Sequence, residues 1–223
     1  MGILYVVATP IGNLGDISSR ALEVLRTVYL IYAEDTRVTK KLLSKYEIHT
    51  RIAHYDEHVP NRTIEEVMRL LNDGKNIAVV SDAGTPGISD PGSVLVSHIQ
   101  KEGPNSQIQA IPGPSAVISA LSVSGISANK FTFLGYPPQK NKRNKFFEEL
   151  SKIETRPIVL YESPHRLKKT LKNISELFGL DYVIFISKEI TKIHETNFTG
   201  TISEALDYFE GSRGLGEFVI IIP

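Results

Sequence analysis

The chain has 223 residues, and its 41% hydrophobic content is enough to bury one or two cores. Its formal net charge is zero, so no overall field draws it to nucleic acid or to a membrane surface. The lack of cysteine excludes disulfides, thiolate metal sites and a cysteine nucleophile.

The first residues bear on the compartment. Met1 leads directly into an apolar strand, without the basic segment that opens a signal peptide. No apolar run approaches the roughly 20 residues that a membrane-spanning helix needs. We therefore expect a soluble, cytoplasmic protein.

The first predicted elements are a strand over Ile3–Ala8, a Gly/Pro loop over Thr9–Asp16 and an amphipathic helix with Ser18 near its N-cap. The loop carries only Gly12 and Gly15, so it does not match the GxGxxG fingerprint of dinucleotide-binding proteins.

A second strand over Leu30–Ala33 ends on the polar cluster Glu34–Arg37. Asp35 or Thr36 could simply cap a following helix over Val38–Tyr46, with an ion pair nearby. The position at the carboxyl end of a buried strand instead favours a functional role. The distance in sequence from the glycine-rich loop Ser81–Gly92 favours an action on the substrate rather than on a cofactor.

A third strand over Arg51–His54 and a helix over Arg62–Asn72 follow. His54, Glu57 and His58 fall between or beside them. Their spacing fits no standard ligand pattern, so no metal site is predicted.

The central feature is a buried strand over Ile77–Val80, followed by the long loop Ser81–Gly92 and a helix that resumes at its predicted N-cap, Ser93. Glycines and prolines interrupt the loop five times. In an open α/β sheet, ligands bind at such strand ends.

The charges of this loop narrow the ligand. It contains Asp82 and Asp90 but no Lys or Arg, so it would repel a phosphate group. It suits a ligand that offers hydroxyls, an ammonium or a sulfonium. The alternative is that the glycines and prolines only shape a turn.

The next strand, Gln107–Ile111, runs into Pro112–Ala116, which opens a helix of small residues to about Ser124. Ser115 and Ala116 have short side chains, so a ligand could approach the backbone N–H groups at this helix start. The pattern then changes, which predicts one domain over 1–126 and another over 127–223.

The second domain is predicted to be mixed α/β. Its expected strands are Phe131–Leu134, Ile158–Tyr161, Tyr182–Ser187, Thr196–Gly200 and Glu217–Ile222, and its expected helices are Asn144–Ile153, Pro164–Phe178 and Ile202–Phe209.

Charge gathers in one stretch of this domain. Lys140–Lys172 holds seven Lys and three Arg against four Glu, a net charge of +6 in a chain of zero net charge. Lysines at such spacing usually mark a solvated helix face. Two basic groups on either side of one strand favour a binding surface for a polyanion.

Five motifs in this order resemble the tetrapyrrole methylase superfamily, the class III S-adenosylmethionine-dependent methyltransferases. They are Tyr5–Asp16, Ala33–Arg37, Ser81–Gly92, Ile111–Ala116 and Tyr161–Arg166. The resemblance implies two α/β domains of the tetrapyrrole methylase type with the cofactor cleft between them.

The motifs are most similar to the branch that 2′-O-methylates a cytidine ribose in the decoding region of small-subunit (16S) ribosomal RNA. This implies S-adenosyl-L-methionine as cofactor, the rRNA or the assembled 30S subunit as partner, and a homodimer. Many members continue past the last strand, whereas this chain stops at Pro223. If the additional segment helps to hold RNA, we expect either a weaker affinity here or a shortened chain.

The resemblance also implies site residues. The cofactor would contact Pro10, Asp82, Ala83, Gly84, Thr85, Ile88, Ser89, Ser115, Ala116, Tyr161 and Glu162. The catalytic candidates, among which the sequence does not choose, are Glu34, Asp35, Arg37 and Glu189. The RNA-binding candidates are Lys140, Lys142, Arg143, Lys145, His165 and Arg166.

Two other functions fit the same residues. A methyltransferase of this fold could act on a tetrapyrrole or another small acceptor, which would not need the basic stretch. A non-catalytic RNA-binding protein could keep the fold without turnover, and it would not need to bind the cofactor.

Overall fold

The computed structural model describes residues 1–55, 61–90, 92–102 and 107–223. The chain divides into two compact units, Met1–Ser115 and Ala116–Pro223. The division falls earlier than the predicted boundary after residue 126, because the helix that follows Ser115 packs within the second unit.

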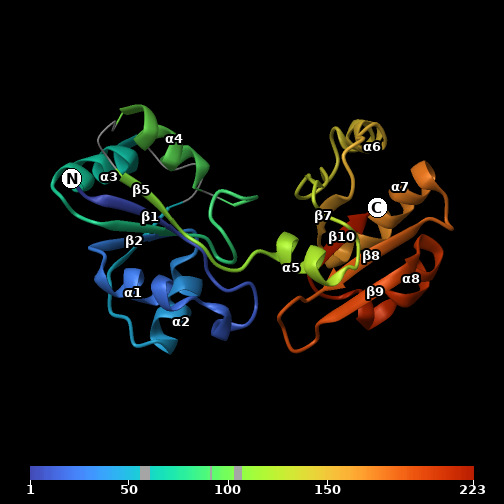
Figure 1. Ribbon diagram of the computed structural model, residues 1–223, viewed down its shortest axis with the longest axis horizontal. Helices are drawn as coiled ribbons and strands as arrows, with labels where there is room; N and C mark the ends of the chain where they lie inside the picture. Colours follow the sequence, from blue (N-terminus) through green and yellow to red (C-terminus); the bar gives the residue numbers. More distant parts are fainter. Residues whose placement is uncertain (56–60, 91, 103–106) are drawn as a thin grey trace. The chain divides into compact units, whose positions relative to one another are not determined.

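The first unit is built on a parallel five-stranded sheet in the order β3-β2-β4-β1-β5 (Figure 1). The strands are β1 (Ile3–Val7), β2 (Leu30–Ala33), β3 (Ile52–His54), β4 (Ile77–Val80) and β5 (Gln107–Ile111). β2 and β4 are buried along their whole length, as apolar runs in a parallel sheet usually are.

Helices cover both faces of this sheet (Figure 1). The helices α1 (Ser19–Thr27) and α2 (Thr36–Lys45) pack on one face, and α3 (Asn61–Asn72) and α4 (Ser93–Glu102) pack on the other. A short 3₁₀ turn, η1 (Leu14–Asp16), follows β1.

The first residues of α1 and α4 test two of the predicted N-caps. The Ser18 hydroxyl accepts from the amide of Ala21, which confirms that cap. Ser93, by contrast, is already the first residue of α4, where the carbonyl of Gly92 accepts from the amide of Val96. The predicted cap at Ser93 was therefore wrong by one residue.

β1 and β4 lie side by side, with Val6 opposite Val79, although their connections run in opposite directions across the sheet. From β1 the chain crosses through α1 to β2, and from β4 it crosses through α4 to β5. Their carboxyl ends thus form a switch point, where α/β sheets usually bind ligands.

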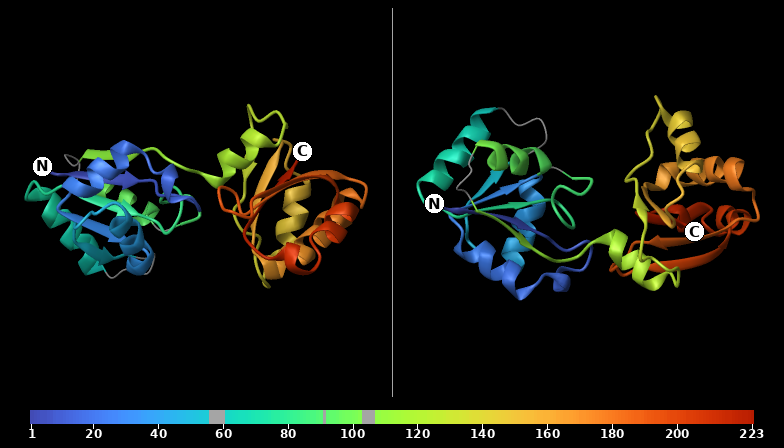
Figure 2. Two further views of the ribbon diagram at one scale, coloured as in Figure 1. Left: turned by 90° about the horizontal axis from the view of Figure 1, so that it is seen from below. Right: turned by 45° about the horizontal axis from the view of Figure 1, so that its top comes forward.

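The second unit has a mixed sheet in the order β6-β7-β10-β8-β9. Its strands lie in the yellow-to-red part of the chain in Figure 2. Only β6 and β7 are parallel, and the other neighbours are antiparallel. The strands are β6 (Thr132–Phe133), β7 (Ile158–Glu162), β8 (Val183–Lys188), β9 (Thr196–Thr201) and β10 (Phe218–Ile222), and a 3₁₀ turn, η2 (Gly211–Gly214), precedes β10.

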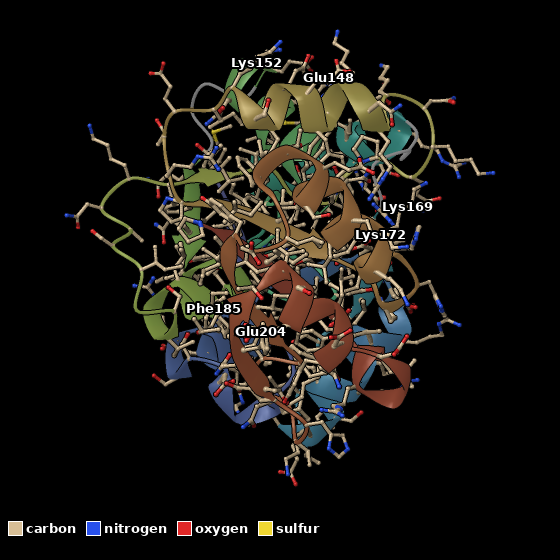
Figure 3. All side chains as sticks on the ribbon, turned by 90° about the vertical axis from the view of Figure 1, so that its right-hand side faces the viewer. Glu148, Lys152, Lys169, Lys172, Phe185 and Glu204 are labelled. Carbon is tan, nitrogen blue, oxygen red and sulfur yellow. The ribbon has the colours of Figure 1, made fainter. Side chains whose placement is uncertain are left out.

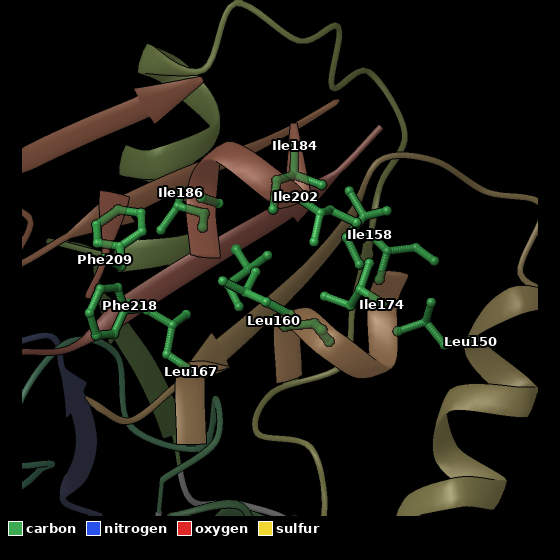
Figure 4. Close-up of a cluster of buried hydrophobic side chains, with 14 of the residues drawn as sticks. Leu150, Ile158, Leu160, Leu167, Ile174, Ile184, Ile186, Ile202, Phe209 and Phe218 are labelled. Atoms are coloured by element: carbon green, nitrogen blue, oxygen red, sulfur yellow. The ribbon is translucent and has the colours of Figure 1, made fainter. Parts of the chain in front are cut away.

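The larger core of this unit lies between the sheet and three helices (Figure 4). They are α6 (Arg143–Ser151), α7 (Pro164–Phe178) and α8 (Ile202–Tyr208). The central strand β10 is buried at all five positions, and its Ile220 packs with Leu160 and Ile186 of the neighbouring strands.

The opposite face of the sheet explains the domain boundary. The helix α5 (Ala116–Val123) places Val117 and Leu121 against Phe185 and Val219. Its apolar side belongs to this core, so α5 is part of the second unit, whereas the sequence prediction placed it at the end of the first.

Candidate cofactor and acceptor site

The loop after β4 is fixed to the loop after β1 by backbone hydrogen bonds. The Thr9 amide donates to the Gly84 carbonyl at 2.8 Å, and the Gly84 amide donates back to the Thr9 carbonyl at 3.1 Å. The Thr9 hydroxyl also donates to the carbonyl of buried Ser81. The two loops at the switch point therefore form one framework.

Gly84 adopts a positive φ of 80°, which a side chain would strain. A Cβ there would lie 3.4 Å from Ile11 and 3.8 Å from the carbonyl of Pro114. The Thr85 hydroxyl reaches the same Pro114 carbonyl at 3.5 Å. The loops after β1, β4 and β5 thus meet around Gly84.

This arrangement brings together part of the predicted cofactor set. Pro10 is buried beside the bridge from Thr9 to Gly84, while Ala83, Ile88 and Ser89 are exposed along the same loop. Ser115 and Ala116 lie directly after Pro114 and are half-buried.

Three carboxylates influence one another at the ends of β2 and β4. Burial, followed by the negative charges of Glu34 and Asp82, raises the pKa of Asp90 to about 6. The Asp82 carboxylate also accepts from the amide of Asp35 at 2.9 Å. The acidic cluster after β2 therefore adjoins the glycine-rich loop, despite its distance in sequence.

Asp35 does what the capping alternative requires. It is the N-cap of α2 and accepts from the amide of Arg37. The exposed Arg37 guanidinium also pairs with this carboxylate at 2.6 Å, and these hydrogen bonds hold the pKa of Asp35 far below its ordinary value. The capping interpretation is confirmed, and a catalytic role remains a prediction.

The site can attract a cation and offer backbone groups to hydroxyls. Glu34, Asp82 and Asp90 supply negative charge, and the described part of Ser81–Gly92 contains no Lys or Arg. Phosphate would be repelled here. Within the described ranges, no group of three or more His, Cys, Asp or Glu could hold a metal ion, and Glu57 and His58 lie outside those ranges.

Glu189 is held by groups of the second unit. Its carboxylate pairs with Lys192 at 2.8 Å and accepts from the amide of Glu217 at 2.9 Å. Burial opposes ionisation, but these hydrogen bonds keep the pKa of Glu189 below its ordinary value. These contacts tie the end of β8 to the segment before β10, and a catalytic role for Glu189 remains a prediction.

Glu162 corrects the prediction that it faces the cofactor. It is fully buried, and its carboxylate accepts from the hydroxyl of Thr170 and from the amide of Ser163 at 2.8 Å, and pairs with Arg166 at 3.1 Å. Its neighbour Tyr161 is half-buried.

Arg143 corrects the predicted set of RNA-binding residues. It is only 3% exposed, because its guanidinium faces α7 rather than solvent. Arg166 pairs with Glu162 and also donates to the carbonyl of Pro137. Both arginines are therefore used inside the unit.

The exposed basic candidates are Lys140, Lys142, Lys145 and His165. Lys169 and Lys172, on α7, add to the basic surface (Figure 3). The sequence alone could not show that Arg143 is buried. It belongs to the same run of basic residues as Lys142 and Lys145, and both of these are exposed.

The fold and the switch-point site define a class of protein. A family model described as Tetrapyrrole (Corrin/Porphyrin) Methylases matches residues 3–206, and the chain belongs to this family. Its members take the methyl group from S-adenosyl-L-methionine.

Full-length relatives are more specific. A protein of Thermotoga maritima named ribosomal RNA small subunit methyltransferase I is 46% identical over 100% of this chain and 98% of its own length. A protein of Bacillus subtilis with the same name is 42% identical over 100% of this chain and 75% of its own length. A relative of about the same length as this chain and a longer relative therefore have the same name.

Solved structures agree on the fold. A uroporphyrin-III-C-methyltransferase of Thermus thermophilus superposes with a TM-score of 0.70 at 16% identity, over 100% of this chain and 94% of that one. A cobalt precorrin-4 methyltransferase gives 0.70 at 15% identity, over 98% and 94%. At these identities the likeness concerns the fold alone.

Proposed function

We propose that this protein is an S-adenosyl-L-methionine-dependent methyltransferase that methylates a cytidine ribose 2′-oxygen in the decoding region of small-subunit (16S) rRNA. The observation that carries the proposal is the 46% identity, over the full chain, to a relative named for small-subunit rRNA methylation. The distant tetrapyrrole-methylating structures share only the fold and do not favour a small acceptor.

The switch-point site fits the cofactor. When bound, S-adenosyl-L-methionine supplies an electrophilic methyl group on a sulfonium, together with an ammonium and ribose hydroxyls. Asp82 and Asp90 offer the negative charge that suits these cations. The positive φ of Gly84 lets the backbone approach a ligand without a side chain in between.

The acceptor hydroxyl must lose its proton as it attacks, and a base with a pKa near the working pH does this best. Asp90, whose pKa is raised to about 6, suits the task better than Asp35, whose pKa is strongly lowered. Glu34 lies close enough to influence Asp90 electrostatically. Asp35 would then hold Arg37 toward the negative acceptor.

The RNA would be held by the exposed lysines that precede and begin α6, Lys140, Lys142 and Lys145, with His165 at the start of α7. The partner would be the rRNA within the 30S subunit, in the cytoplasm, and the active form a homodimer. No helix in the part of the chain that the structure describes is long and apolar enough to cross a membrane.

The proposal is tested by methyl transfer. Purified protein is incubated with labelled S-adenosyl-L-methionine and 30S subunits from a strain lacking this modification, and the labelled nucleotide is mapped. Label on a cytidine 2′-oxygen of the decoding region is expected. Label only on a tetrapyrrole acceptor, or cofactor binding without any transfer, would contradict the proposal.

A further inference from the structure

A buried polar network ties the loop before α6 to α7. Arg143 donates from Nε to Asn173 at 2.9 Å, from Nη2 to the Thr170 hydroxyl at 2.7 Å and from Nη1 to the carbonyl of Pro138 at 3.0 Å. All three nitrogens of the guanidinium are thus used, two on α7 and one on the loop.

A second arginine holds the neighbouring residue of the loop. Arg166 donates to the carbonyl of Pro137 and pairs with the fully buried Glu162. Glu162 in turn accepts from Thr170, which links the two arginines through one hydroxyl. Consecutive carbonyls, at Pro137 and Pro138, are therefore fixed by two charged groups.

The residue just before this fixed pair is an exposed aromatic. Tyr136 is 49% exposed, and its ring centre lies 5.4 Å from that of Tyr161 on β7. Tyr161 in turn packs edge-on against Phe133 at 4.9 Å. The Tyr136 ring is thus supported from within the unit, while about half of the residue's surface is exposed.

Exposed lysines continue the same loop. Lys140 and Lys142 follow Tyr136 within six residues, and both are exposed. An accessible aromatic ring beside cations is the combination with which proteins bind single-stranded nucleic acid, because bases stack on the ring while phosphates contact the charges.

We propose that Tyr136 is a stacking surface for an unpaired base of the RNA, and that Arg143 and Arg166 are positioning residues that fix it through Pro137 and Pro138. This inference rests on the proposed rRNA substrate and adds how one base is recognised. It also reassigns both arginines from phosphate contact to support of the loop.

Stacking and charge contacts respond differently to salt. A lysine that neutralises a phosphate contributes about −0.7 to the slope of log affinity against log salt on single strands, whereas a stacked ring contributes nothing. Loss of one stacked base costs about 5- to 150-fold in affinity. The two kinds of contact can therefore be measured separately.

The experiment uses the full chain and a decoding-region RNA hairpin, with affinity measured by fluorescence anisotropy at several salt concentrations. Tyr136→Ala is expected to weaken binding at least about 5-fold with an unchanged salt slope. Tyr136→Phe should bind like the wild type. Tyr29→Ala, at a tyrosine of the first unit that is 43% exposed, is the matched control.

The base is located by a scan of single abasic sites along the hairpin. At one position, removal of the base should weaken wild-type binding and leave Tyr136→Ala unaffected. Wild-type affinity in Tyr136→Ala, or equal losses in both proteins at every abasic position, would overturn the stacking inference.

The positioning role is tested with Arg143→Lys, after a melting curve has shown that the variant is folded. It should lose affinity at an unchanged salt slope, and Tyr136→Ala in that background should add little. Because lysine keeps the positive charge but cannot make all three of the arginine's contacts, wild-type affinity in the folded variant would overturn the positioning role and restore a phosphate contact. If the variant does not fold, Arg166→Lys replaces it with the same criteria.

Failure of this inference is distinct from failure of the proposed function. Methyl transfer by the wild type to 30S subunits is measured in parallel. Transfer by the wild type together with wild-type RNA affinity in Tyr136→Ala would reject the stacking surface alone. If the wild type neither binds the hairpin nor transfers a methyl group, the rRNA substrate itself is rejected, and the stacking inference falls with it.

Discussion

Gly84 has a backbone conformation that a side chain would strain, and a single substitution can test this. Its φ of 80° means that Gly84→Val adds about 1–2 kcal/mol of backbone strain and fills the space toward Ile11. We expect the variant to lose cofactor affinity in calorimetric titration, because the loop can no longer approach the ligand.

Gly74 provides the matched control. It has a φ of 76°, and no atom lies within 4 Å of the point that a Cβ would occupy, so Gly74→Val carries similar strain away from the site. The two variants should lose comparable stability, and only Gly84→Val should lose binding. Equal cofactor affinity in both folded variants would rule out backbone approach at Gly84.

The raised pKa of Asp90 predicts that both stability and cofactor affinity depend on pH. Its folded pKa, about 6, exceeds the unfolded value of about 4, so its ionisation lowers stability as the pH rises through this window. A cationic ligand binds better once Asp90 is ionised. If binding lowers the pKa of Asp90 by about one unit, cofactor affinity should rise by about fivefold between pH 5 and pH 7.5.

The comparison uses Asp90→Asn, with Asp16→Asn, at an exposed position on the first loop, as control. Affinity in Asp90→Asn should not vary with pH, and its free energy of unfolding at pH 7.5 should exceed that of the wild type. A pH dependence that persists unchanged in Asp90→Asn would assign the titration to another group.

At the scale of elements, the start of α2 combines a cap with a predicted catalytic group. Asn also caps helices well, so Asp35→Asn should keep the melting temperature while removing the charge. If the carboxylate holds Arg37 toward the acceptor, Asp35→Asn and Arg37→Ala should each lower methyl transfer by about 100-fold or more. Cofactor affinity should stay unchanged.

Asp35→Ala separates the two roles, because it removes the cap as well as the charge. It should lower both the melting temperature and the transfer rate. If a stable Asp35→Asn variant kept full activity, the role of Asp35 would be limited to capping α2.

The loop before α6 is tested by replacing Lys140, Lys142 and Lys145 together with Ala. All three are exposed, and the third forms only a long 3.7 Å pair with Glu149. The salt slope of 30S binding should flatten by up to about 2 units. Lys40, Lys41 and Lys45 on α2, also exposed, make a matched triple control. Equal slopes in both triple variants would make the loop a solvated face.

The elements themselves were largely predictable from the sequence. β2, β4 and α7 begin and end where the apolar pattern placed them, and β1 ends one residue earlier than predicted. Strands and amphipathic helices follow from local periodicity, which a single sequence contains. The boundary at α5 was missed because an apolar helix side does not reveal which sheet it covers.

The site was predictable in part. Glycine and proline density placed the loop around Gly84, but the approach of Asp90 to Glu34 depends on strand order, which is not a local property. The same limit applies to Arg143, whose partners on α7 lie 27 and 30 residues away. The contacts at the site that the sequence could not predict are therefore those between residues far apart in the chain.

At the scale of the whole molecule, the two units have separate cores, and the predicted cofactor loop belongs to the first. Ligand binding should slow amide hydrogen exchange most around Thr9 and Gly84, which share the backbone bridge. Exchange in β8 and β10 should change little. Hydrogen-exchange mass spectrometry with and without cofactor measures this, and protection confined to the second unit would contradict the proposed site.

The place of β10 in the chain affects how the protein is made. Phe218–Ile222 forms the middle strand of the second sheet, yet it is synthesised after the other four strands of that sheet. The first unit can fold when residue 115 has emerged, whereas the second must wait for its own centre. At about 5–20 residues per second, that wait lasts roughly 5–20 s. During it, β7 and β8 have no strand between them, and the nascent chain exposes apolar edges to which chaperones bind.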